Sequence, residues 1–546
     1  MKFLPIIGIL SFFFPFSIFA QDIYIQSAVH FDRSLYVNGD TAWFSVNLPE
    51  NLEYKKNSIL RVQVLTSDKF KLIDEFYLKI NEDKKANGYL AIPYTINSGT
   101  YLVKFIVWNE NNKKSVVLIT HCLHLINDES EIRPNELSFL HSDSPMNIKK
   151  HDLNFEIKLN QSIYKPRENI KMEIISKENK ASTINLNFSV SISRKSLFSS
   201  QKSYFKNTSY SSILSDPFSV GGDIMVTAIF KDLNTNDFLK RSYLYAFIEN
   251  DGLVSAISTD ANGHALLNLK PSVNGLNIQF YDPFKRNFSV GVEKIIFKES
   301  SKVKDVNFDI NKINSFQVQS RKQKKIKYLF EEYNNYSAPK NPTWQFEADQ
   351  SVQSSDYISF KSLREFMETI SSPFKIINYK GELRPKMING SSKGVFPESP
   401  VFLINRELAS FNEVLALEIN NINYIDFYNI QETLKRFGQM GKNGIVALYT
   451  YLPVKLSDFA QSIQTVGIQQ DKNYPVQFYN SRSYNIPALN PTVYWNPRVT
   501  MEIDGKININ FLHGDDVGQY EIKLLGRDSN GKLGSKMTSY EVLYNP

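Results

Sequence analysis

Short β-forming runs separated by turn residues constrain this chain more than any other feature. AWFSVNL (42–48), LRVQVLT (60–66) and YLVKFIVW (101–108) are strand-like. Turn residues punctuate them at Asn38-Gly39-Asp40, Asn87-Gly88 and Ser98-Gly99. Short strands at even spacing predict β-sandwiches. The 39 Phe and 29 Tyr residues agree, because aromatic side chains favour strands. We therefore expect a mainly β chain, with roughly three to five domains for its length.

An internal repeat makes the sandwich prediction more specific. HFDRSLYVNGDTAWF (30–44) aligns with KLNQSIYKPRENIKM (158–172), so that Tyr36 matches Tyr164 at an offset of 128 residues. Each copy reads as a strand, an S-φ-Y stretch, a turn and a second strand. We expect the tyrosine to pack into the corner, and Gly39 to permit the turn in the first copy.

This corner resembles the macroglobulin-type (MG) repeats of the alpha-2-macroglobulin superfamily, which often read D-K-x-x-Y-x-x-G-D/E. The matching residues are Asp32, Tyr36, Gly39 and Asp40 in the first copy, and Tyr164 and Glu168 in the second. Members that trap proteases use a thioester in a Gly-Cys-Gly-Glu-Gln motif. The single cysteine, Cys122, stands in THCLHL instead, which excludes that chemistry. Cys122 and His124 share a strand face, but two ligands are too few for a zinc site.

A third β unit follows from Gly221 to Leu269. Its T-D-A-N-G segment (259–263) resembles the hairpin of transthyretin-like, carboxypeptidase-regulatory-type sandwiches. We expect Asp260 and Gly263 to form the turn, with calcium binding as the alternative. Farther on, Ile326, Leu329, Phe330 and Tyr333 follow the spacing of a helix. The lysines of RKQKKIK (321–327) then lie on the solvated face, or alternatively attract acidic lipid or a partner.

The pattern changes after two polar stretches read as linkers, SAPKNP (337–342) and ADQSVQSS (348–355). Ser362 and Glu365 form a capping box for a helix, as do Ser410 and Glu413. Apolar residues stripe the first helix at Leu363, Phe366, Met367 and Ile370. Three strands are expected, in FKIINY (374–379), VFLIN (401–405) and NINYIDFY (421–428).

The segment RFGQMGKNGIVALYTY (436–451) closes this region with several glycines and a strand. A phosphate loop would run from a strand through the glycines into a helix; here a helix, which Asn429 can cap with Glu432 three residues on, enters and a strand leaves. Apolar residues stripe that helix at Ile430, Leu434 and Phe437, and Gly438 is placed to end it.

The order of these elements resembles the plug domain of TonB-dependent outer-membrane receptors. The residues that hold the family's glycine and threonine places are Gly438, Gly441, Gly444 and Thr450. Asn405-Arg406 replaces the family's Asp-Gly. We expect no barrel, because too few residues follow Tyr451 for some 22 strands of about 10 residues.

The last segment predicts another sandwich, with an Asp504-Gly505 hairpin turn. His513, Asp515 and Asp516 cluster in one of its loops. A metal site is the alternative there to a polar turn.

The fold class is therefore mainly β, with tandem MG/Ig-like and transthyretin-like β-sandwiches and one small plug-like α+β domain. We expect these units in order: a signal peptide (1–20), an MG-like sandwich (21–128), a linker (129–151), a second MG-like sandwich (152–218), a carboxypeptidase-regulatory or transthyretin-like sandwich (219–298), a helical or linker segment (299–354), the plug-like domain (355–455) and a C-terminal sandwich (456–546). This series resembles one group of exported proteins from Bacteroidota.

The first twenty residues have one lysine, an apolar run and a small residue at Ala20, which is typical of a secretory signal peptide. A membrane anchor is disfavoured because Pro15 interrupts the run and a span needs about 20 apolar residues. We expect an exported protein on the periplasmic or cell-surface side of the outer membrane, associated with that membrane only through partners.

Motifs of known chemistry are absent from the sequence: G-x-S-x-G, H-E-x-x-H, a Walker loop and paired cysteines. The net charge of +7 is mild for this length and does not indicate nucleic-acid binding. We expect no enzyme and no catalytic, cofactor-binding or metal-binding residue.

The preferred hypothesis is a non-catalytic scaffold subunit of an outer-membrane complex. Its partner would be a β-barrel protein of a SusC/SusD-type, TonB-dependent importer, a secretion translocon or the barrel-assembly machinery. The alternative is a free protein that binds a ligand, peptide or glycan.

Overall fold

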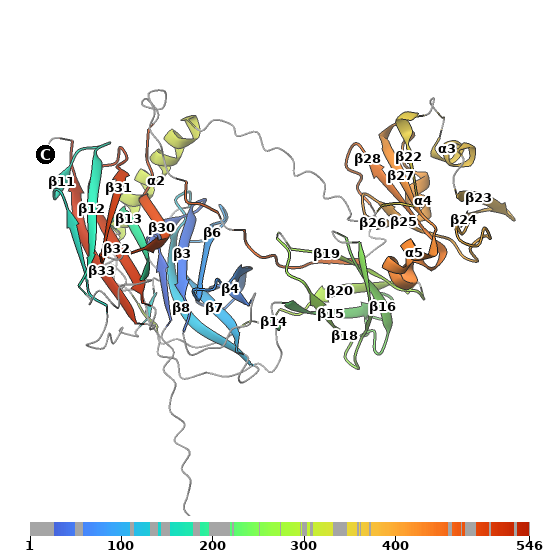
Figure 1. Ribbon diagram of the computed structural model, residues 1–546, viewed down its shortest axis with the longest axis horizontal. Coiled ribbons are helices and arrows are strands. Elements are labelled where there is room, and N and C mark those ends of the chain that lie inside the picture. The colour runs from blue at the N-terminus through green and yellow to red at the C-terminus, as the bar shows by residue number, and fades with distance from the viewer. Residues whose placement is uncertain are drawn as a thin grey trace, which may run out of the picture.

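The described residues form three β-sandwiches, one α+β unit and a separate long helix, shown as a computed structural model in Figure 1. Along the long axis of the molecule lie the second sandwich, the first, the third and then the α+β unit. The structure describes residues 27–49, 58–109, 114–130, 140–142, 153–177, 186–195, 219–220, 223–296 (without 250–251, 274, 285 and 295), 303–305, 309–330, 347–456 (without 357–359, 361 and 371–372), 461–475 (without 471) and 487–544 (without 502–503 and 529–531). The predicted signal peptide lies outside the described residues. The chain is mainly β, as predicted.

The first sandwich packs a three-stranded sheet, ordered β1-β3-β6, on a five-stranded sheet, ordered β2-β8-β7-β4-β5. Its strands are β1 (Ala28–Phe31), β2 (Leu35–Val37), β3 (Thr41–Asn47), β4 (Ile59–Thr66), β5 (Leu72–Lys79), β6 (Lys85–Ala91), β7 (Gly99–Asn109) and β8 (Lys114–Ile126). The core between the sheets holds the alternate apolar residues of each strand, such as Phe44, Val62 and Phe105. This alternation places one face of each strand inside.

The second sandwich is built from two distant parts of the chain, which corrects the predicted division into sandwiches at 152–218 and 456–546. The first part supplies β10 (Phe155–Leu159), β11 (Ile163–Tyr164), β12 (Asn169–Ser176) and β13 (Asn187–Arg194). The last part supplies β30 (Thr492–Thr500), β31 (Lys506–Leu512), β32 (Gly518–Arg527) and β33 (Leu533–Val542). The two parts interleave in sheets ordered β10-β12-β31 and β11-β33-β32-β13-β30, and they share one core. Four short strands cannot cover a sandwich core alone, so the early strands pair with the late ones.

The repeated corner has the same hydrogen bonds in both sandwiches. The Tyr36 hydroxyl donates to Asp32 Oδ1 at 2.7 Å, and the Tyr164 hydroxyl donates to Asn160 Oδ1 at 2.9 Å. Both tyrosines are fully buried. Asp40 and Glu168 accept the N–H groups of Val37 and Lys165, respectively, at 2.8 Å. Gly39 has φ of +80°, which suits glycine. The predicted repeat and the structural role of its residues are confirmed.

The third sandwich is formed by β14 (Ser219–Val220), β15 (Asp223–Asp232), β16 (Tyr243–Ile248), β17 (Leu253–Ser258), β18 (His264–Leu269), β19 (Asn277–Tyr281), β20 (Phe288–Val292) and β29 (Gln461–Gln464). One sheet runs β14-β15-β18, with β20 also paired to β15, and the other runs β17-β16-β19-β29. The edge strand β29 comes from residues that we assigned to the C-terminal sandwich. After β29 the chain continues to the first sandwich, where Tyr77 N–H donates to the Gly467 carbonyl at 3.2 Å.

The α+β unit contains a sheet ordered β22-β27-β28-β25-β26 and a separate β23-β24 hairpin. Its strands are β22 (Gln350–Gln353), β23 (Phe374–Tyr379), β24 (Glu382–Met387), β25 (Val401–Ile404), β26 (Glu407–Ala409), β27 (Ile422–Tyr428) and β28 (Ile445–Thr450). Its helices are α3 (Leu363–Thr369), α4 (Phe411–Leu415) and α5 (Gln431–Leu434), with 3₁₀ turns η2 (Ser354–Asp356), η3 (Ile419–Asn421) and η4 (Lys435–Asn443). The predicted strands and the apolar face of α3 are present. The stretch 348–355, predicted as a linker, instead forms β22 and pairs with β27.

Helix caps in this unit were predicted with mixed success. Ser410 and Glu413 form the expected reciprocal capping box, and Ser362 accepts the N–H of Glu365 at 3.2 Å. Asn429 does not cap α5, however. The Asp349 carboxylate does so from outside the local sequence, accepting the N–H groups of Asn429 and Ile430 at 2.6 and 2.7 Å.

Asn405 and Arg406, which replace the Asp-Gly of the resemblance, form a tight hairpin turn between β25 and β26. Both have positive φ, at 50° and 76°, which is the backbone of a two-residue hairpin turn. The Asn405 side chain also bonds Thr450 twice, accepting its N–H at 2.9 Å and donating to its hydroxyl at 2.8 Å. The turn therefore ties β25 to the end of its parallel neighbour β28.

The first and second sandwiches meet through a buried polar interface. His30 of β1 contacts two hydroxyls of β13, Ser189 at 2.7 Å and Ser191 at 2.9 Å. Thr492 donates to Asp32 at 2.5 Å, and Arg527 donates to the Leu48 carbonyl. Burial, with a smaller effect of Lys523, lowers the pKa of His30 to about 3. The neutral imidazole is therefore part of the folded interface.

Acid should weaken this interface through His30. The unfolded imidazole binds a proton below pH of about 6.5, whereas the folded one stays neutral, so stability is lost as pH falls. Between pH 6.5 and 5 this amounts to about 2 kcal/mol for one histidine. The check is urea unfolding as a function of pH for the wild type and for His30→Gln, which should flatten the slope. Ser191→Ala, which keeps the imidazole, should lower the midpoint but retain the slope. Equal slopes in all three proteins would contradict the assignment.

Candidate functional site

Helix α2 (Ile310–Phe330) lies across the junction of the first two sandwiches (Figure 1). The helical spacing of Ile326, Leu329 and Phe330 predicted a helix around the basic run, and the helix begins at Ile310; Tyr333 lies outside the described residues. Just before it, β21 (Val303–Asp305) pairs with β9 (Leu140–Ser142), so the predicted linker 129–151 contains a strand. Ile313 and Gln317 of α2 are buried against the sandwiches.

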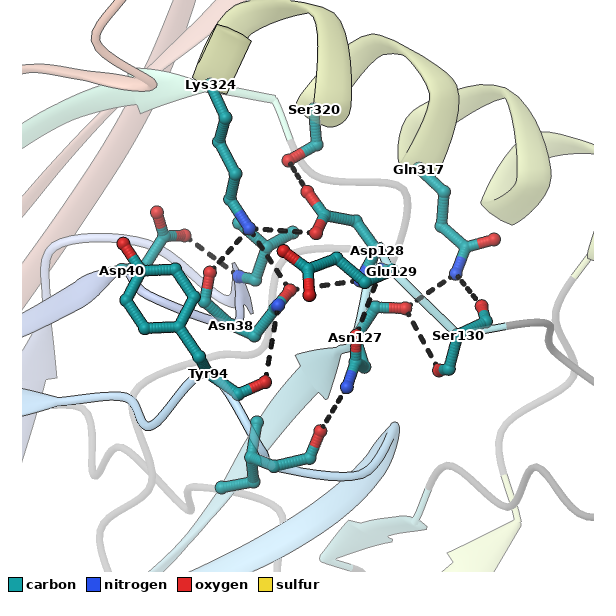
Figure 2. A network of polar contacts seen from close by, with 12 residues as sticks. Asn38, Asp40, Tyr94, Asn127, Asp128, Glu129, Ser130, Gln317, Ser320 and Lys324 are labelled. Carbon is teal, nitrogen blue, oxygen red and sulfur yellow. Dashed lines mark hydrogen bonds and ion pairs between the residues drawn. The ribbon is translucent and has the colours of Figure 1, made fainter. Parts of the chain in front are cut away.

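The contacts of α2 with the first sandwich centre on Asp128 (Figure 2). The Asp128 carboxylate is fully buried and accepts hydrogen bonds from Lys324 Nζ at 2.8 Å and from the Ser320 hydroxyl at 2.7 Å. Lys324 also donates to the Asn38 carbonyl at 2.6 Å, and Gln317 donates to the Asn127 carbonyl at 2.7 Å. Lys324 thus faces the sandwich, which corrects the prediction that the lysines of 321–327 share the solvated face. Arg321, Lys322 and Lys325 are exposed as predicted.

The second sandwich contacts the same helix through the loop before β32. Gln323 donates to both oxygens of Asp516 at 2.9 Å. Burial raises the pKa of Asp516. Helix α2 therefore binds both sandwiches, and it holds them in the relative positions that the His30 interface sets.

A cavity of about 680 Å³ lies under α2, between the two sandwiches. The first sandwich lines it with Arg33, Leu35, Val37, Gly39, Asp40 and Tyr94, and the second with Arg194, Lys195, Leu489, Asn490, Pro491, Asp516, Gly518 and Gln519. The helix adds Asn311, Lys312, Ser315, Phe316, Gln319, Ser320, Gln323 and Lys324. The size suits a small ligand or a short peptide.

The loop with His513, Asp515 and Asp516 is a polar turn in which each group has a protein partner. Arg167 binds Asp515 through two hydrogen bonds of 2.5 and 2.8 Å. Although burial opposes it, these bonds and one from Ala488 N–H hold the pKa of Asp515 below its usual value. His513 is buried edge-on against Tyr520, and burial lowers its pKa. The described part of the chain contains no cluster of three His, Cys, Asp or Glu residues that could hold a metal ion.

The other sequence candidates are packed into strands and turns. Cys122 is buried with Leu65 and Leu102, and His124 contacts the Thr100 hydroxyl at 3.1 Å. Asp260 accepts the N–H groups of Asn262 and His264 at 2.7 and 2.9 Å, which is the predicted turn role.

The connections β15–β16, β17–β18 and β19–β20 meet at one end of the third sandwich, here named the loop end. Arg286 joins two of them, donating to Asp282 at 2.6 Å and to the Ser242 hydroxyl at 3.0 Å. Large apolar side chains are exposed there on Leu233, Phe238, Tyr243 and Phe284. Sequence reasoning missed these residues because isolated exposed aromatics carry no pattern; only the folded loops bring them together.

Comparison with known proteins gives structural likeness only. No protein-family model and no curated protein matches the chain. Salmonella alpha-2-macroglobulin reacted with methylamine is similar at 8% identity and a TM-score of 0.24, over 95% of this chain and 39% of that chain. Escherichia coli alpha-2-macroglobulin activated by porcine elastase is similar at 9% identity and 0.24, over 95% and 44%. The Yersinia pseudotuberculosis adhesin InvE follows at 11% identity and 0.14, over 52% and 58%.

The chain spans about two-fifths of the length of these macroglobulins.

Proposed function

We propose that the protein is a non-catalytic scaffold subunit of an outer-membrane protein complex and docks through the loop end of its third sandwich. The observation that carries this proposal is the distribution of exposed apolar side chains. Among the described residues, 18 large apolar side chains are exposed, of which seven lie on the third sandwich and six on the α+β unit. The first two sandwiches and α2, of similar total size, hold the other five. Four of the seven on the third sandwich, namely Leu233, Phe238, Tyr243 and Phe284, belong to the loop end, and exposed apolar side chains of this kind mark an interaction site.

The architecture supports docking by this part of the molecule. Helix α2 and the polar interface fix the first two sandwiches to each other. The α+β unit contacts the third sandwich, where Leu408 N–H donates to Gln279 Oε1 at 2.5 Å and Phe247 enters the core of the α+β unit. The loop end begins at Tyr243, at the end of β16 opposite to Phe247, and presents connections braced by Arg286. A braced surface loses little conformational entropy on binding.

The proposed partner is an outer-membrane β-barrel protein. The predicted export signal places the chain outside the inner membrane. The helix–strand order of 355–455 resembles the plug domain of such receptors, and among the described residues no helix has the length and apolar character to cross a bilayer. A barrel partner would supply the membrane association.

Loss of two loop-end side chains should separate the protein from its partner. We expect the double substitution Leu233→Ser and Phe284→Ser to reduce co-purified barrel protein more than tenfold, because interface energy concentrates in a few apolar anchors. The measurement is purification from native membranes followed by quantitative mass spectrometry. The matched control, Ile163→Ser with Met537→Ser, removes two exposed apolar residues from the second sandwich and should retain the partner. Equal recovery from both variants, or a wild-type protein recovered alone in the soluble fraction, would overturn the proposal.

The junction cavity favours a second candidate function, that of a ligand-binding protein. A thermal-shift screen with peptides and glycans distinguishes the two, because the scaffold alone predicts no shift with small ligands.

A further inference from the structure

We propose that the junction cavity under α2 binds an acidic peptide. The site is separate from the loop end, so it stands whether or not the scaffold proposal holds. Three properties of the cavity support this: its charge, its apolar walls and its size.

The charged groups that line the cavity leave an excess of positive charge. Five are cationic, namely Arg33, Arg194, Lys195, Lys312 and Lys324, and two are acidic, Asp40 and Asp516. Two of the cations are already paired, since Arg33 binds Asp40 at 3.0 Å and Lys324 binds Asp128.

The backbone N–H of Arg194 donates to the Pro491 carbonyl at 2.9 Å, but the side chains of Arg194 and Lys312 form no hydrogen bond or ion pair with the residues that the structure describes. Arg194 lowers the pKa of Asp516 only against the larger effect of burial, and that carboxylate already accepts two hydrogen bonds from Gln323. Carboxylates from a ligand would match these two cations, which come from different elements.

The cavity also has apolar walls. Leu35, Val37 and Tyr94 line the cavity from the first sandwich, and Phe316 lines it from the helix. A small inorganic anion would use only converging cations. In a peptide that alternates acidic and apolar side chains, the acidic ones would contact the cations and the apolar ones would contact the apolar lining. A cavity of about 680 Å³ has room for a few residues.

The cavity also follows the edge of a sheet. Strand β2 is the terminal strand of its sheet, paired on one side with β8, and both Leu35 and Val37 of β2 line the cavity. Both residues are buried, and Asp40 already bonds the N–H and the carbonyl of Val37, so this edge contributes an apolar wall to the cavity. A short acidic peptide with apolar side chains is therefore the ligand class that matches the charge and the apolar walls of the cavity.

Fluorescence anisotropy with the full-length protein tests this proposal. The probe is a fluorescein-labelled acetyl-Glu-Leu-Asp-Phe-amide, and the neutral comparison is acetyl-Gln-Leu-Asn-Phe-amide. We expect saturable binding of the acidic peptide, at least tenfold tighter than binding of the neutral one, and weaker at higher salt. Arg194→Gln should weaken binding about tenfold and Lys312→Gln several-fold.

Lys325→Gln is the matched control, because it removes the same charge from an exposed position of the same helix outside the cavity; it should change affinity less than twofold. A charge-reversal variant distinguishes loss of the binding site from misfolding of Arg194→Gln. Arg194→Glu should no longer bind the acidic peptide and should bind acetyl-Lys-Leu-Lys-Phe-amide instead. Equal affinity for the acidic and neutral peptides, or equal effects of Arg194→Gln and Lys325→Gln, would overturn the proposal.

Discussion

Gly444→Ala should destabilise the α+β unit by about 3–5 kcal/mol. Gly444 has φ of +90° and connects η4 to β28. A non-glycine residue in such a conformation costs about 1–3 kcal/mol. An added Cβ would also approach the Met387 sulfur, a fully buried atom. Making room in a packed core adds about 1–3 kcal/mol. Hydrogen–deuterium exchange of the β28 amides measures this loss as local unfolding.

Gly381→Ala is the control that separates the backbone cost of Gly444→Ala from its packing cost. Gly381 has φ of +88°, but an added Cβ would meet nothing within 4 Å. Its substitution should therefore cost only about 1–2 kcal/mol, the price of backbone conformation alone. If both variants lose the same stability, Met387 moves aside freely and the packing argument for Gly444 is wrong.

Asp128→Ala should release α2 from the first sandwich, at a cost of about 2–3 kcal/mol. The substitution removes two hydrogen bonds from a carboxylate with 0% exposure, and hydrogen bonds to charged groups contribute about 1.5–3 kcal/mol each. The lower total reflects Lys324, whose side chain is 28% exposed and regains some water. Limited proteolysis within α2, together with the urea midpoint, measures the effect.

Two further variants test whether the loss of stability in Asp128→Ala comes from its interaction with Lys324 or from any substitution in this part of the chain. Glu129→Ala removes an exposed carboxylate from the adjacent position and should change stability by less than about 0.5 kcal/mol. A double-mutant cycle of Asp128→Ala with Lys324→Met should give a coupling energy of about 1 kcal/mol or more. If the stability changes of the two single substitutions simply add in the double variant, the Asp128–Lys324 contact does not contribute to stability.

Local features of the fold were predictable from the sequence. The corner around Tyr36 and Tyr164, the turn at Asp260 and the capping box at Ser410 each involve residues within about four positions. Their hydrogen bonds depend on spacing along the chain, and spacing is what a sequence shows. The strands themselves were predictable for the same reason, because alternation of side chains is a local property.

Contacts between distant segments were not predictable. Asp349 caps a helix 80 positions away, and Lys324 binds Asp128 across 196 positions. The adjacent sequence does not single out either residue, because Asp349 stands in a polar stretch and Lys324 in a run of similar lysines. For the same reason, the strands of the second sandwich could be found individually, but not the pairing of β13 with β30 and β32.

The divided second sandwich has a consequence for the order in which the protein folds. As synthesis delivers the chain from its N-terminus, the first sandwich and the α+β unit can each close on their own strands. Strands β10 to β13 keep their apolar faces uncovered until strands β30 to β33 have been synthesised. Segments with uncovered apolar faces are prone to aggregation, and strands that pair over long sequence separations pair slowly. Strands β30 to β33 therefore complete the second sandwich, and a chain without them would keep the apolar faces of β10 to β13 exposed beside a finished first sandwich.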